Sequence, residues 1–193
     1  MAQDEISLIK IAQQGDAKAF EELVNRYDRN VLTIALKYFN NEDDAKDVYQ
    51  EVFIRVYNSI KGFKFQSSFS TWLYRITVNV CITMATKAGR HEFVPVTKKF
   101  DDQENEEEIL TSNELSPDGF ALNNEKGIAI NNALEKLPPK QRICFVLKYF
   151  EGYKIIEIAE MLKCKDGTVK KYLFDAQNKM RYLLKDYAVE AAK

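Results

Sequence analysis

Aromatic, basic and amide side chains gather in one acid-free stretch of the chain, and this combination suits binding to unpaired DNA. From Lys61 to Arg90 the sequence has basic residues but no aspartate or glutamate. Aromatic rings stack on the faces of unpaired bases, while cations follow the phosphate backbone. A simpler interpretation is that some of the phenylalanines only fill a hydrophobic core. The candidate DNA contacts in this stretch are Phe65, Phe69, Trp72, Arg75, Asn79, Thr83 and Lys87.

A second group of candidate DNA contacts lies near the C-terminal end, where residues 140–187 are clearly basic. A helix predicted from about Gly167 to Tyr187 would turn lysines and one phenylalanine outward. Cations on such a face can bind phosphates, and an apolar ring edge can meet a thymine methyl group. The alternative is a basic amphipathic hairpin that binds nothing. The candidates are Thr168, Lys170, Lys171, Phe174 and Asn178.

A third group suggests a protein-binding face on a helix predicted from about Glu42 to Lys61. The residues on its outward side are acidic or polar except for one isoleucine, and an exposed isoleucine is typical of a small partner-binding patch. A solvated acidic face is the usual alternative. The candidates are Asp47, Gln50, Glu51 and Ile54.

The sequence lacks the residue patterns of a catalytic, metal or cofactor site. It has one histidine, His91, and neither a phosphate-binding glycine loop nor ligand spacing among Cys81, Cys144 and Cys164. We therefore expect no enzymatic activity, cofactor, metal or small-molecule substrate. The first residues do not form a secretion signal, and no apolar run is long enough to span a bilayer. A soluble cytoplasmic protein without membrane insertion is expected.

Helical periodicity organises the elements that position these groups. Abundant Leu, Ile, Lys, Glu and Ala with few Gly and Pro residues favour an all-α fold. The N-terminal half predicts a short helix capped by Asp4, a long helix capped by Asp16, the helix from about Glu42 to Lys61, and one from a Ser70 cap to about Ala88. In the last helix we expect Leu73, Ile76, Val80 and Met84 to be buried.

The acidic stretch from residue 91 to 122 lacks apolar periodicity, which indicates a flexible linker between two small domains. A short helix from Glu104 to Leu110 is the alternative. Beyond it, helices are predicted from about Asn124 to Leu137, from Pro139 to near Gly152, from Lys154 to Lys163, and from about Gly167. The last two, joined by a short turn, predict a helix-turn-helix. The expected division is an N-terminal helical bundle at 1–90, the acidic linker at 91–122 and a four-helix domain at 123–193.

The order of these motifs resembles the bacterial RNA polymerase sigma factors of the extracytoplasmic-function group. The segment DDAKDVYQEVFIRVY is similar to the family segment that docks on the clamp coiled coil of the polymerase β′ subunit. FSTWLYRITVN resembles the segment that melts and reads the minus-10 element. The segment from Leu137 to Arg181, with its LPP start and GTVK helix opening, resembles the domain that reads the minus-35 element. The resemblance implies contacts with both the β′ and β subunits of core polymerase, and it allows for an anti-sigma partner.

The chain departs from the family pattern at several positions. The family commonly has an aspartate at Thr83 and basic residues at Thr86 and Lys87. It has Gly and Ser at Lys163 and Lys165, and arginines where this chain has Tyr172, Asp175 and Gln177. An aspartate beside a phosphate is repulsive, so Asp175 predicts altered minus-35 binding.

The resemblance implies a transcription initiation factor that brings core polymerase to promoters and aids strand opening. Two other function classes compete with it. A free-standing helix-turn-helix regulator needs only the C-terminal half and usually dimerises on a palindrome. A nucleic-acid enzyme needs a catalytic constellation, which this sequence does not provide. Promoter-specific transcription with core polymerase distinguishes these classes.

Overall fold

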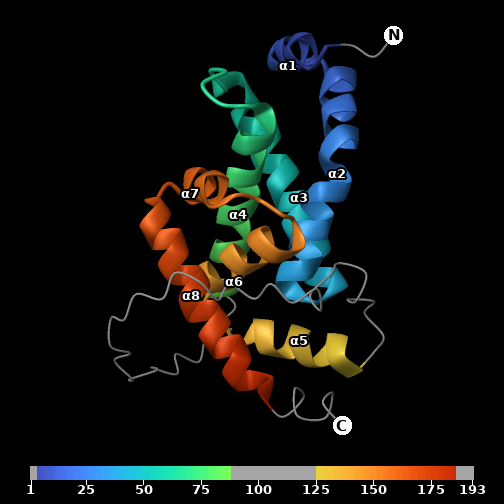
Figure 1. Ribbon diagram of the computed structural model, residues 1–193. Helices are drawn as coiled ribbons and strands as arrows, with labels where there is room; N and C mark the ends of the chain where they lie inside the picture. Colours follow the sequence, from blue (N-terminus) through green and yellow to red (C-terminus); the bar gives the residue numbers. More distant parts are fainter. Residues whose placement is uncertain (1–3, 88–124, 186–193) are drawn as a thin grey trace.

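The fold is entirely helical throughout the residues that the structure describes. A computed structural model describes residues 4–87 and 125–185, and within these two ranges it contains helices and no strand. The predicted all-α class is therefore confirmed. The residues 91–122 assigned to the linker, and the alternative helix within them, lie outside the described ranges. Figure 1 shows the helices in chain order: α1 (Glu5–Gln13), α2 (Ala17–Phe39), α3 (Glu42–Ser59), η1 (Ile60–Gly62), α4 (Phe69–Lys87), α5 (Glu125–Glu135), α6 (Pro139–Phe145), η4 (Val146–Phe150), α7 (Ile155–Leu162) and α8 (Asp166–Leu183).

The helices of the N-terminal half begin and end at polar residues close to the predicted positions. The carboxylate of Asp16 accepts a hydrogen bond from the amide of Ala19 at 2.8 Å, which confirms it as the cap of α2. Asp4 stands before α1 but makes no side-chain capping bond. Helix α2 ends at Asn40, whose φ of 53° lies in the left-handed region. The Asn41 side chain then caps α3.

The loop between α3 and α4 ends at a serine cap two residues earlier than predicted. The hydroxyl of Ser68 accepts from the amide of Thr71 at 3.1 Å, and α4 begins at Phe69. Ser70, the predicted cap, lies inside the helix and shares a hydroxyl contact with Ser68. The loop is therefore two residues shorter at this end, and Ser68 hydrogen-bonds both Ser70 and Thr71 in the first turn of α4.

Proline and a π-helical turn shape the C-terminal half. Pro139 occupies the first turn of α6, where its missing amide is tolerated. Helix α6 continues into the π-helical segment η4, which ends at Phe150, and Gly152 shortly after it has a left-handed φ of 73°. The turn between α7 and α8 passes through Lys163, which adopts a left-handed φ of 51° although a glycine is easier there. The predicted helix-turn-helix is present.

The two halves pack against each other and share one hydrophobic core. Helix α4 contacts α6 and α7, and α2 contacts η4 and α5 (Figure 1). The ring of Tyr74 on α4 lies 5.7 Å from that of Tyr153, just before α7. Arg142 of α6 is only 2% exposed and donates to the carbonyl oxygen of Tyr38 on α2 at 3.3 Å. The described helices thus form one closed body, a packing that the sequence analysis did not anticipate.

This packing changes which residues of α4 are buried. Leu73 and Val80 are buried as predicted, whereas Ile76 and Met84 are only half-buried. A second face of the helix is buried instead, because α6 and α7 cover it. Its members are Tyr74, Val78, Cys81 and Ala85.

Candidate nucleic-acid interface

Aromatic rings build a small hollow between the η1 loop and the first turns of α4. Phe63 is buried, and its ring lies 4.9 Å from Phe65, 5.8 Å from Phe69 and 5.1 Å from Trp72. Beside these rings is a cavity of about 150 Å³, which we call the loop cavity. Its lining combines an aromatic wall with cations and small polar groups. The lining residues are Gly62, Phe63, Lys64, Gln66, Ser67, Trp72 and Arg75.

Phe65 in this loop and Phe69 at the start of α4 differ in solvent exposure, so they differ in what their rings can contact. Phe65 has a left-handed φ of 58°, a strained conformation for a bulky residue, and its side chain is 40% exposed. Its ring is therefore available at the rim of the loop. Phe69 is only 3% exposed and packs against Tyr27 and Trp72. Phe69 thus supports the loop from inside. The sequence analysis selected Phe69 as a DNA contact, but its buried ring is not placed to touch DNA.

The remaining candidates follow one face of α4. Arg75 and Asn79 lie one turn apart, Asn79 is exposed, and Thr83 follows after another turn. The hydroxyl of Thr83 donates to the carbonyl oxygen of Asn79 at 2.7 Å, so this hydroxyl is already engaged within the helix. Lys87 is exposed at the last turn of α4. The face therefore runs from the loop cavity to the end of the helix, and Arg75 pairs with a residue of the C-terminal half.

That pairing joins Arg75 to Glu160 on α7 across 3.7 Å. The Arg75 side chain is 23% exposed and that of Glu160 is 49% exposed. An ion pair this open to solvent contributes little stability, about 0–1 kcal/mol. The pair nevertheless places the Glu160 carboxylate beside Arg75, a cation of the candidate DNA face. This carboxylate would have to move away before a phosphate could bind to Arg75.

The outward face of α8 carries the C-terminal candidates. Lys170, Lys171 and Phe174 are exposed, and Phe174 is a large apolar residue with 56% of its surface accessible. Thr168 and Asn178 are half-buried, and the Asn178 side-chain oxygen accepts from Arg181 at 3.0 Å. Val169, Leu173, Ala176 and Met180 are buried on the opposite side of the helix. The exposed Arg181, which the sequence analysis did not select, adds a cation to this face because it lies seven residues after Phe174.

The outward face of α3 carries the acidic candidates. Asp47 and Gln50 are exposed, Glu51 is half-buried, and Ile54 is 56% exposed. Tyr57 is 55% exposed, with an edge contact to Phe20 at 5.1 Å between ring centroids. Tyr57 follows Ile54 by one turn, so the apolar part of this face is larger than the sequence analysis predicted.

Two negative findings apply to the residues described here. Among them, no group of three or more His, Cys, Asp or Glu residues is arranged to hold a metal ion. No helix within these same ranges has the length and hydrophobicity needed to cross a membrane.

Comparison with known families matches both halves of the chain. The model for Sigma-70 region 2 matches residues 23–91, and the model for Sigma-70, region 4 matches residues 128–180. The first range contains the loop cavity and the faces of α3 and α4. The second range contains the helix-turn-helix.

Similar proteins cover nearly the whole chain. The ECF RNA polymerase sigma-E factor of Escherichia coli (strain K12) is 34% identical over 92% of this chain and 95% of its own length. Among solved structures, CnrH in complex with the cytosolic domain of CnrY has a TM-score of 0.64 at 22% identity, covering 95% of this chain and 97% of that one. The sigma factor RpoE from Bartonella quintana, solved with the anti-sigma factor NepR, has a TM-score of 0.60 at 21% identity, covering 88% and 98% of the two chains.

Proposed function

The chain belongs to the extracytoplasmic-function group of bacterial RNA polymerase sigma factors, and from this premise we propose which of its surfaces performs each step of promoter recognition. As a member of this group it directs polymerase to promoters, and it is not a free-standing regulator. The observation that carries the assignment is the presence in one chain of an aromatic loop beside α4 and a helix-turn-helix with a basic outward face.

The loop cavity and the adjoining face of α4 act on the minus-10 element. Unpairing one base costs a few kcal/mol, and stacking plus pocket contacts can offset that cost without nucleotide hydrolysis. The exposed Phe65 of the loop and Trp72 in the cavity wall supply rings, while Lys64 and Arg75 supply charge. Residues farther along α4 contact the strand next to the opened base. This group comprises Arg75, Asn79, Thr83 and Lys87.

The outward face of α8 acts on the minus-35 duplex. Lys170 and Lys171 are exposed in the first turns and can neutralise phosphates. Phe174 presents its ring where a thymine methyl group can contact it. Asp175 is half-buried at the edge of this face and opposes phosphate binding. Thr168, Asn178 and Arg181 complete the surface.

The outward face of α3 holds the polymerase, with the β′ clamp coiled coil as its partner. Acidic groups at Asp47 and Glu51 surround the exposed Ile54, and Tyr57 extends the apolar patch. This arrangement has the apolar centre and polar rim that are common in protein interfaces. We place a contact with the β subunit on the C-terminal half.

Other properties follow from this assignment. The protein acts without catalysing a reaction and without a cofactor, and its site of action is the cytoplasm, where polymerase works. An anti-sigma factor is a further partner, supported by the RpoE structure solved with such a factor. We propose region 2 at 1–90, the acidic linker at 91–122 and region 4 at 123–193.

Reconstituted transcription tests the proposed function. Purified chain added to core polymerase is expected to produce transcripts from a discrete set of fragments of its own genome. Two reactions serve as comparisons. One contains core polymerase alone, and the other contains core polymerase with a chain that lacks its C-terminal half. If added protein leaves the set of initiated sites unchanged while binding core polymerase, the promoter-directing role is rejected.

A further inference from the structure

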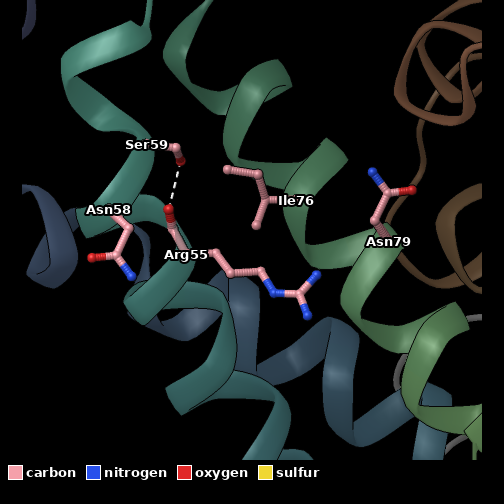
Figure 2. A pocket seen from close by; sticks show the side chains of 5 residues that line it. All are labelled: Arg55, Asn58, Ser59, Ile76 and Asn79. Carbon is pink, nitrogen blue, oxygen red and sulfur yellow. Dashed lines mark hydrogen bonds between the residues drawn. The ribbon is translucent and has the colours of Figure 1, made fainter.

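A second and larger cavity lies between α3 and α4, apart from the loop cavity. It is a hollow of about 350 Å³ that is open to solvent. We call it the α3–α4 cavity, and Figure 2 shows the five side chains that line it: Arg55, Asn58, Ser59, Ile76 and Asn79. The first three come from the last turns of α3 and the other two from α4. None of the roles proposed above uses Arg55, Asn58 or Ser59.

Arg55 is the charged group of this cavity, and its side chain is paired with a carboxylate on the same helix. Its Nε donates to Glu51 Oε1 at 2.7 Å, one turn earlier on α3. The Ser59 hydroxyl donates to the carbonyl oxygen of Arg55 at 2.5 Å, shown as the dashed line in Figure 2. With Nε engaged, the two terminal nitrogens of the guanidinium extend from α3 toward α4 (Figure 2). Glu51 therefore acts as a positioning residue for Arg55.

The chemistry of the lining fits a nucleobase better than a phosphate group. A phosphate oxygen accepts hydrogen bonds, so a phosphate site is built from donors. This cavity instead mixes the Arg55 donors with amide groups of Asn58 and Asn79, which both donate and accept. The apolar side chain of Ile76 adds a surface against which a flat ring can pack. Such a mixture of edge-reading polar groups and apolar contact is how proteins read bases.

The position of the cavity fits a base next to the one opened at the loop. Trp72 and Arg75 line the loop cavity, while Ile76 and Asn79 line the α3–α4 cavity one turn later on the same face of α4. One helical turn rises about 5.4 Å, whereas neighbouring nucleotides in a duplex are about 3.4 Å apart. An opened strand is no longer held to the stacked spacing, so neighbouring nucleotides can reach both cavities.

We infer that the α3–α4 cavity binds a second promoter base, a guanine of the opened strand adjacent to the base held at the loop, with Arg55 as its specificity-determining residue. Two terminal guanidinium nitrogens match the paired O6 and N7 acceptors of guanine, the commonest specific contact of arginine. Adenine presents a donor in place of O6, so it repels one of these nitrogens. This inference rests on the proposed minus-10 role of α4 and extends it to a helix assigned so far only to polymerase binding.

Selection from a single-stranded DNA pool tests the inference. Holoenzyme made with wild-type chain or with Arg55→Ala is incubated, at saturating core polymerase, with oligonucleotides carrying a short randomised segment, and the bound fraction is sequenced. The wild type is expected to show a guanine preference at one position beside the base with the strongest overall preference. Arg55→Ala is expected to lose that single preference, by about 10-fold in relative affinity, and to keep the others.

Matched variants and a modified base make the outcome decisive. Arg29→Ala removes an exposed arginine from α2 and should leave every preference unchanged. With wild-type holoenzyme, 7-deazaguanine at the selected position should reproduce the loss, because it removes the N7 acceptor. If Arg55→Ala weakens all sequences alike, Arg55 contacts the backbone and the inference is overturned. An unchanged preference profile overturns it as well, while retained promoter-specific transcription in either case leaves the proposed function standing.

Discussion

The guanidinium of Arg142 on α6 lies 5.3 Å from the ring centroid of Tyr38 on α2, and both side chains are buried. Arg142 also donates to the carbonyl oxygens of Tyr38 and Glu135, so one side chain links α2, α5 and α6. The Tyr38 hydroxyl donates in return to the carbonyl oxygen of Pro139 at 3.4 Å. Since Tyr38 belongs to region 2 and Arg142 to region 4, this contact holds the two promoter-reading halves together.

A closed body of this kind cannot read both promoter elements at once. The centres of the minus-10 and minus-35 elements are about 25 base pairs apart, or about 85 Å at about 3.4 Å per pair. A compact chain of this length has a radius of gyration of only about 16 Å. The halves are therefore expected to separate on the promoter, and the contacts between them to favour the free protein.

Replacing Arg142 is expected to destabilise the closed body. Arg142→Met keeps much of the side-chain volume but removes the donors to two backbone carbonyls, and leaving buried acceptors unpaired costs about 1–3 kcal/mol. The free energy of unfolding, measured by urea denaturation followed by circular dichroism, should fall by about that amount. Lys140→Met, at an exposed position of the same helix, should change it by less than about 0.5 kcal/mol. Equal stability of the two variants would show that Arg142 does not hold the halves together.

The cysteines should report the separation of the halves. Burial raises the pKa of Cys81 and of Cys144 to about 12, so at neutral pH both remain protonated and react slowly with alkylating reagents. Cys164 is only half-buried and should react first in the free protein. Mass spectrometry after pulse alkylation should show faster labelling of Cys81 and Cys144 in the promoter-bound holoenzyme. Labelling rates that stay the same in free and promoter-bound protein would argue against separation.

Charge reversal on α3 should weaken polymerase binding. Asp47→Lys with Glu51→Lys places cations on the face around Ile54, and we expect at least about a 10-fold loss of core affinity, about 1.4 kcal/mol. Fluorescence anisotropy with labelled chain measures the affinity, and circular dichroism checks the helical content. Glu21→Lys, an exposed acid on α2, is the control. A double variant that binds core polymerase like the control would remove α3 from the interface.

Loss of one amide on α4 should impair strand opening. Asn79 is exposed, so Asn79→Ala should leave the core intact while removing a contact to the opened strand. Permanganate reactivity of promoter thymines, which reports unpaired bases, is expected to fall in the variant holoenzyme. Asn30→Ala on α2 provides the matched amide control. Undiminished reactivity with Asn79→Ala would show that this side chain has no part in opening.

Charge changes on α8 should alter duplex binding in opposite directions. If Lys170 neutralises one phosphate as proposed, Lys170→Ala should decrease the salt dependence of binding to a minus-35 duplex by about one unit for all sequences alike. Asp175→Arg replaces repulsion by attraction and should tighten binding, most clearly at low salt where screening is weakest. Asp175→Asn should give an intermediate affinity. Weaker binding by Asp175→Arg, with the fold retained, would mean that another face of region 4 meets the DNA.

Local patterns in the sequence determined the helices and most of their outward faces. Residues three and four apart share a side of a helix, so periodicity alone placed Lys170 and Phe174 outward and Val169 and Leu173 inward on α8. Short-range hydrogen bonding likewise made Asp16 a recognisable cap, and the missing amide of Pro139 marked the start of α6. The order of the motifs was sufficient to identify the family.

Only the tertiary structure determined which neighbouring helices cover a second face of α4 and which of two nearby phenylalanines is buried. Periodicity marks an apolar stripe but does not name its partner, so the second buried face of α4, with Tyr74 and Cys81, became visible only where α6 and α7 pack on it. The same holds for Phe65 in the loop and Phe69 at the start of α4, which are close in sequence yet differ in burial because of the rings around them. The burial of Arg142 depends on Tyr38, a residue 104 positions away. Contacts over such separations arise from how whole helices pack, and the sequence around either residue carries no local signal of them.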